Sequence, residues 1–154
     1  MADLLRTLES EADAVLRFVG LLKQEQESLA NGDVDALAPI IQRKNAIAIE
    51  LTAFAKQRNA SLAANGLGAD RAGIDAWCER HPTDTRTREN WSRILTLANE
   101  ARELNRVNGE LIKIRMQHNA QALDALLGAS QSLNLYGPDG QSAGRSSRRI
   151  NDAA

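Results

Sequence analysis

Apolar positions recur every three or four residues along most of this chain, and the longest such run lies between Thr87 and Gly128. This run contains no proline, and its main stripe consists of Ile94, Leu97, Ala101, Leu104 and Leu111. Such spacing places the side chains on one face of a helix. About 40 helical residues would span roughly 60 Å, and so long and polar a helix needs partner helices to cover its stripe.

The second half of this predicted helix carries two apolar arcs when each residue advances by about 100°. The first arc consists of Leu104, Val107, Leu111, Ile114 and Ala125. The second arc, roughly a quarter turn away, consists of Ile112, Met116, Leu123 and Leu127. Two arcs imply two partners. We expect the rest of the chain to cover the first arc, and either a further helix of the chain or a different protein to cover the second.

Two more helices are predicted, at about residues 3–30 and 34–64. The first has a heptad stripe, whose 3.5-residue spacing favours left-handed supercoiling against a neighbour; it consists of Leu8, Ala12, Val15, Val19, Leu22, Gln26 and Leu29. The short turn at residues 31–33 predicts that the two helices pair antiparallel. The second stripe includes Lys44 and Arg58, and we expect their charged groups to reach solvent on apolar stems.

A connector separates the second helix from the long one. Glycines at positions 66 and 68 end the second helix, and Asp70 is expected to cap a short helix at about 70–80. We expect Trp77 to close one end of the bundle, and Pro82 to end the short helix. The predicted fold is therefore all-α: an antiparallel bundle of three long helices with coiled-coil packing over residues 1–128, with the third long helix at about 86–128.

The composition changes after Gly128 and becomes rich in Ser, Gly, Asn and Asp. We interpret residues 129–154 as a C-terminal tail. It contains a short apolar motif formed by Leu133, Leu135 and Tyr136. Two interpretations stay open for this motif. It either folds back onto the bundle end or docks on a partner as a linear motif.

Composition narrows the class of protein. Aromatic residues make up only 3% of the 154 residues, so the core must be aliphatic, as in helix bundles. The 19 basic and 20 acidic residues are interspersed, which argues against a general affinity for nucleic acid or anionic lipid. The single Cys78 excludes an intrachain disulfide, and neither a signal peptide nor a membrane span is predicted. We expect a soluble, cytoplasmic protein.

The sequence offers little for catalysis. Cys78 and His81 stand three residues apart with Asp84 nearby, but a metal site needs more ligands of this kind. His118 on a long helix is the one candidate for phosphotransfer, and its neighbours do not support that role. No nucleophile–base pair and no phosphate-binding loop is present. We therefore expect no enzyme activity and no cofactor.

Four segments together resemble one known family. They are the N-terminal heptad helix with the turn NGDVDAL, the stretch IIQRKNAIAIELTAFAKQR, the stretch ELNRVNGELIKIRMQHNAQALDALLGA, and the terminal LYGPDGQ. In this order and at this spacing they resemble the FlgN family of flagellar export chaperones over nearly the full length. The resemblance implies a catalytically inert helical chaperone for hook–filament junction (hook-associated) proteins, which it would keep competent for the flagellar type III export apparatus. It also implies that the cargo contacts lie in the C-terminal part of the chain.

The sequence therefore predicts a partner-binding site at Ile112, Met116, Leu123, Leu127, Leu133, Leu135 and Tyr136. The alternative is a structural coiled-coil adaptor, or a homo-oligomeric bundle in which the second arc is permanently buried. A homodimer also stays open in the chaperone interpretation. A phosphorelay domain using His118 is the third hypothesis.

Overall fold

A computed structural model describes residues 2–135, with side chains for residues 3–128, and in these residues all regular structure is helical. The order is α1 (Ala2–Asn31), α2 (Leu37–Ala64), α3 (Asp70–Arg80) and α4 (Thr85–Leu135). This confirms the predicted all-α class. The chain forms two compact units, one ending at Leu111 and the other beginning at Ile112, so the border falls inside α4.

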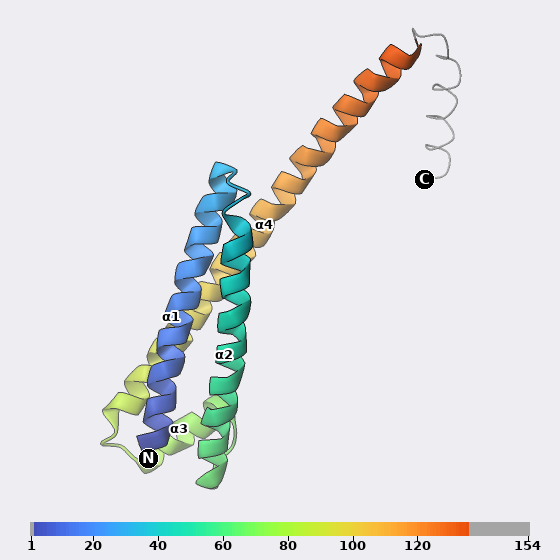
Figure 1. The fold of residues 1–154 in the computed structure, drawn as a ribbon. Helices are drawn as coiled ribbons and strands as arrows, with labels where there is room; N and C mark the ends of the chain where they lie inside the picture. Colours follow the sequence, from blue (N-terminus) through green and yellow to red (C-terminus); the bar gives the residue numbers. More distant parts are fainter. Residues whose placement is uncertain (1, 136–154) are drawn as a thin grey trace. The chain divides into compact units, whose positions relative to one another are not determined.

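The first unit is built around α1. Its heptad stripe is buried at Leu8, Ala12, Val15, Val19, Leu22 and Leu29, as predicted, while Gln26 is only partly buried. α1 and α2 lie side by side and run in opposite directions (Figure 1). They share a cluster that contains Ala14, Leu21, Ile40 and Ile47. The predicted antiparallel pairing of the first two helices is therefore confirmed.

The first part of α4 packs along the other side of α1. Three ion pairs join the two helices in the same order along both: Glu9 with Arg86, Asp13 with Arg93 at 3.5 Å, and Lys23 with Glu100 at 3.0 Å. The matching order means that α1 and α4 run parallel. Successive long helices alternate in direction because α2 returns the chain to the end of the bundle at which α1 begins, and α4 starts from that end after α3 (Figure 1).

The short helix α3 closes that end of the first unit. Trp77 is 2% exposed and packs with side chains from the other three helices in a cluster formed by Leu4, Leu8, Ala12, Leu62, Ile74, Trp91 and Ile94. The Trp77 indole stacks on His81, with ring centroids 4.0 Å apart, and donates a hydrogen bond to Asp84 Oδ2 at 3.2 Å. The prediction that Trp77 closes the bundle is confirmed.

The prediction that the charged group of Arg58 reaches solvent was wrong. Its side chain is buried and forms ion pairs with Glu11 of α1 and, at 2.9 Å, with Asp70 of α3. Its guanidinium also lies 5.1 Å from the ring centroid of Trp91 in α4. Glu11 is buried on the side of α1 that faces α2. The attraction of the Arg58 guanidinium to this carboxylate and to the Trp91 indole therefore outweighs the hydration that the guanidinium would have in solvent. Arg58 is therefore an internal residue whose ion pairs join α2 to α1 and α3 and whose ring contact joins α2 to α4.

Three expectations about helix ends also need correction. Asp70 is the first residue of α3 rather than its cap, and it adopts φ 56°, a conformation that Asp tolerates better than most residues. It accepts hydrogen bonds from Arg58 and Asn59 and thereby fixes α3 to α2. α2 begins at Leu37, not at residue 34. The long helix continues to Leu135, not 128, because residues 129–135 contain neither glycine nor proline to stop it.

Candidate partner-binding surface

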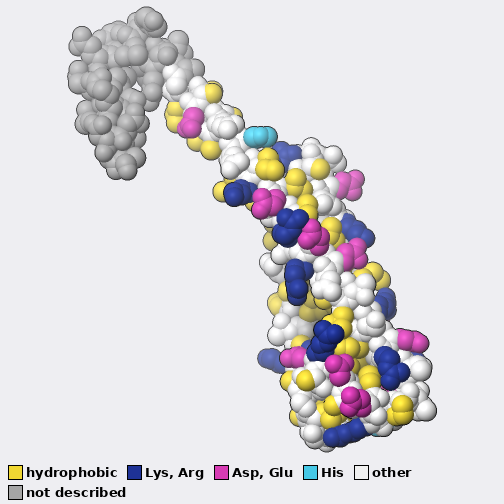
Figure 2. All heavy atoms as spheres, turned by 180° about the vertical axis from the view of Figure 1, so that it is seen from behind, with side chains coloured by type: hydrophobic (Ala, Val, Ile, Leu, Met, Phe, Trp, Pro, Cys, Tyr) yellow, Lys and Arg dark blue, Asp and Glu magenta, His cyan; other side chains and the backbone are white. Residues whose placement is uncertain are grey.

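All of the predicted binding residues except Tyr136 lie on the part of α4 that belongs to the second unit. Between Ile112 and Leu127 the sequence contains neither glycine nor proline, and Leu, Met, Ala and Gln favour the helix. The second-arc side chains are exposed: Ile112 by 42%, Met116 by 67%, Leu123 by 56% and Leu127 by 51%. Figure 2 shows apolar side chains on the visible surface of this segment. We call Ile112, Met116, Leu123 and Leu127 the α4 stripe.

The α4 stripe lies on one face of the helix. At about 100° per residue its four side chains fall within roughly 60° of one another, and it is roughly 22 Å long. Lys113 and Asp124 are exposed and border the stripe. A narrow apolar face with charged borders has the form of a helix that packs into a groove or against another amphipathic helix.

Two further exposed large apolar residues of this segment were not predicted as part of the surface. Leu126 is 69% exposed and borders the stripe beside Leu127, and its position on the helical wheel was the signal that could have revealed it. Ile114 was assigned to the arc covered by the rest of the chain, yet it is 45% exposed. That expectation holds only as far as Leu111, where Leu104, Val107 and Leu111 are half-buried.

The predicted tail motif lies mostly outside what the structure describes. Leu133 and Leu135 belong to the last turns of α4, and their side chains are outside the described residues. Tyr136 lies outside them altogether. Leu133 and Leu135 are therefore part of a helix rather than of an extended tail, since α4 does not end at residue 128.

A buried polar network lies a short distance before the border between the two units. Asn108 of α4 is 1% exposed, and its amide donates hydrogen bonds to the Leu22 carbonyl at 2.9 Å and to Glu25 Oε1 at 2.8 Å. Glu25 is 4% exposed and also forms an ion pair with Lys44 of α2 at 3.0 Å. Lys44 is thus paired and mostly covered, rather than solvated as expected. Glu25 lies outside the predicted heptad stripe, whose polar member is Gln26.

The surroundings of Cys78, His81 and His118 bear on the metal and phosphotransfer hypotheses. Burial raises the pKa of the Cys78 thiol, which keeps it protonated at neutral pH. His81 stacks on Trp77, and its Nδ1 lies 3.0 Å from the Trp77 carbonyl oxygen. His118 is exposed on the second unit. Within the described residues, no group of three or more His, Cys, Asp or Glu side chains could hold a metal ion.

Asp84 acts as the cap of α4. Its carboxylate accepts hydrogen bonds from the Thr87 backbone N–H at 3.1 Å and from the Thr87 hydroxyl at 2.6 Å. Burial by itself would raise the pKa of Asp84, but the hydrogen bonds from Thr87 and Trp77 outweigh it, so the pKa lies below its usual value.

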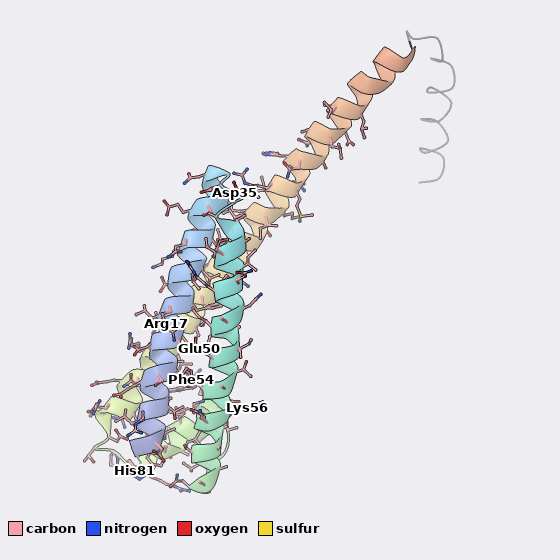
Figure 3. The ribbon with its side chains drawn as sticks, viewed as in Figure 1. Arg17, Asp35, Glu50, Phe54, Lys56 and His81 are labelled. Carbon is pink, nitrogen blue, oxygen red and sulfur yellow. The ribbon has the colours of Figure 1, made fainter. Side chains whose placement is uncertain are left out.

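A shallow cavity of about 540 Å³, which the sequence does not predict, lies between α1 and α2. Leu21 and Ile47 contribute apolar surface to it, and Arg17 and Glu50 border it. These two side chains come from neighbouring helices (Figure 3) and form an ion pair at 3.2 Å. The cavity contains no pair of groups suited to acid–base or nucleophilic chemistry.

The fold and surface define an all-helical protein with a closed bundle unit and a second unit that presents an apolar helix face. No helix in the described part of the chain is long and apolar enough to span a membrane. The family model described as "FlgN protein" matches residues 1–144. The chain belongs to the FlgN family.

Curated relatives agree with this assignment. The chain is 31% identical over 145 residues to "Flagella synthesis protein FlgN" of Yersinia enterocolitica serotype O:8, a match that covers 90% of this chain and 91% of the relative. It is 27% identical over 143 residues to the protein of the same name from Proteus mirabilis, covering 92% and 90% of the two chains. No solved structure matches the chain.

Proposed function

We propose that this protein is a cytoplasmic export chaperone of flagella synthesis that binds hook-associated proteins of the hook–filament junction. The α4 stripe would pack against a helix of the cargo, and Leu133, Leu135 and Tyr136 would add contacts with the cargo or with the flagellar type III export apparatus. The bound cargo would be kept from premature assembly until delivery. No step in this role requires catalysis or a cofactor.

The observation that carries this proposal is the exposure of the α4 stripe in a family whose named relatives serve flagella synthesis. Four large apolar side chains on one face of a helix leave apolar area in water that a partner helix would remove. Each Å² of apolar area removed contributes about 25 cal/mol before the cost of ordering the partners is subtracted. A cargo helix with its own apolar stripe supplies that area.

The test is the double variant Met116→Asp with Leu123→Asp, titrated against a purified hook–filament junction protein. Both side chains are more than half exposed, so the variant should keep its helicity and its melting temperature. It should lose cargo binding, because each carboxylate would be left unpaired in an apolar contact. Ile49→Asp is the matched control, since Ile49 is 73% exposed on α2, and this variant should bind normally.

The same titration separates the alternative of a purely structural adaptor. An adaptor without cargo predicts that the unmodified protein does not bind any junction protein at micromolar concentrations. Full-affinity binding by the folded double variant would instead place the cargo site outside the α4 stripe. A flagellated strain that carries the double variant should assemble hooks but few filaments if the proposal holds.

A further inference from the structure

The spacing of the four residues in the α4 stripe is symmetric about its midpoint. Ile112 and Leu127 lie equally far from the midpoint between residues 119 and 120, and so do Met116 and Leu123. If two copies of this helix pair antiparallel about a two-fold axis at that midpoint, Ile112 meets Leu127 of the other copy and Met116 meets Leu123. The stripe is thus complementary to itself, as a two-fold interface requires.

One pair of charges beside the stripe follows the same symmetry. Lys113 and Asp124 lie on the same edge of the stripe, within about 20° of each other around the helix. A two-fold axis between antiparallel helices places equal edges opposite each other, so Lys113 of one copy faces Asp124 of the other with an axial offset of roughly 3 Å. Both side chains are exposed, and neither has an ion-pair partner among the described residues.

The centre of the stripe also suits such a pair. Asn119 and Ala120 lie next to the midpoint, on opposite edges. Asn119 of the two copies would meet across the axis, roughly 1.5 Å apart along the helices, where their amides can donate to and accept from each other. Ala120 on the other edge lets the helices approach closely. A single Asn in an otherwise apolar helix contact fixes register and orientation.

We propose that two copies of this protein pair antiparallel through residues 112–128, and that this pairing covers the face assigned above to cargo. The competition between self-pairing and cargo rests on the proposed function, whereas the pairing itself does not. A contact of about 22 Å with four large apolar side chains per copy is small, so the dimer forms at micromolar or higher concentration and dissociates on dilution. Self-pairing thereby protects the stripe from non-specific contacts until a cargo helix replaces the second copy.

The experiment is sedimentation equilibrium of the full chain over a range of concentrations, with charge-reversed variants. Lys113→Asp and Asp124→Lys each turn two attractive contacts per dimer into two repulsive ones. Each alone should raise the dimer Kd about tenfold, since exposed pairs contribute little individually. The variant with both reversals restores opposite charges and should return the Kd to within about twofold of the original. Lys56→Asp, at an exposed position on α2, should leave the Kd unchanged.

A chain that stays monomeric to about 500 μM would overturn the self-pairing, and so would a double reversal that dimerises no better than the single ones. Binding of a junction protein by such a monomer would leave the proposed function standing. A dimer rescued by the double reversal but indifferent to every junction protein would sink the proposed function alone. Where both hold, adding a junction protein should convert the dimer into a one-to-one complex, and a two-to-two complex would contradict the competition.

Discussion

The Asn108 side-chain amide in α4 lies 2.8 Å from Glu25 Oε1 in α1 and donates to it, in a buried position three residues before the bundle unit ends at Leu111. The same amide donates to the Leu22 carbonyl. Two donors on one side chain thus hold α4 at a fixed height along α1. Beyond this point α4 enters the second unit, whose apolar side chains are exposed.

Replacing Asn108 with Ala should destabilise the bundle by about 1–3 kcal/mol, because the buried Glu25 carboxylate and the Leu22 carbonyl each lose a donor. Asn108→Asp should cost more at neutral pH, since it places a second carboxylate beside the buried Glu25. Urea titration of both variants measures these differences. Equal stability of both variants and the original chain at neutral pH would show that the network does not hold the helices.

Single and double substitutions at the buried pair of Arg58 and Glu11 should affect stability differently. Arg58→Ala should destabilise the chain by about 3–5 kcal/mol, because Glu11 is left as an uncompensated buried charge. Arg58→Met together with Glu11→Leu removes both charges and fills the space, and should recover most of that loss. Thermal melts of the single and double variants check this. If the double variant is no more stable than Arg58→Ala, the uncompensated charge of Glu11 does not explain the loss of stability.

Two glycines should respond to alanine in opposite directions. At Gly109, inside α4, an added Cβ would meet nothing within 4 Å, so Gly109→Ala should stabilise the helix by about 0.5–1 kcal/mol. At Gly73 in α3 the Cβ would lie 2.9 Å from Leu62 Cδ1 and closer still to the Gly68 backbone, so Gly73→Ala should cost about 1–3 kcal/mol. Melting temperatures that move the same way for both would contradict this account of the packing.

Asp84 gives the fold an acid-sensitive cap. Because its pKa is lowered in the folded chain, its contribution to stability is complete above its usual pKa and is lost as the pH falls through the lower folded value. Asp84→Ala should therefore cost about 1 kcal/mol at pH 7. Asp84→Asn keeps a capping oxygen but cannot titrate, so its stability relative to the original chain should improve below about pH 4. Denaturant titrations between pH 7 and pH 3 measure this, and a constant difference across that range would refute the capping role.

Much of the fold could be predicted from the sequence because it depends on periodicity. The heptad stripe of α1 and the position of Trp77 follow from apolar residues at helical spacing, which the bundle then buries. Arg58 could not be predicted, because its burial depends on Glu11, Asp70 and Trp91, which lie on three other helices. The same is true of Glu25, whose partners Lys44 and Asn108 come from α2 and α4. Periodicity identifies which face is covered but not which charges meet there.

Periodicity predicted the candidate surface only in part. The sequence indicated a second apolar arc on the long helix, and its members Ile112, Met116, Leu123 and Leu127 are exposed. The apolar spacing along the long helix does not show where the bundle stops burying its side chains. Ile114 continues the first arc yet is exposed, because the buried contacts made by α4 end near Asn108 and Leu111. Leu126 was missed because it lies at the edge of the arc.

The central claim, that cargo covers the α4 stripe, is tested most directly by thiol labelling at position 116. In a Cys78→Ser background, Met116→Cys places one reactive thiol on the stripe, and Ile49→Cys places the matched thiol on α2. The rate of modification by a maleimide is measured at low protein concentration with and without a saturating hook–filament junction protein. We predict that cargo slows modification at position 116 at least tenfold and leaves position 49 unchanged. Equal rates at position 116 with and without bound cargo would contradict the account.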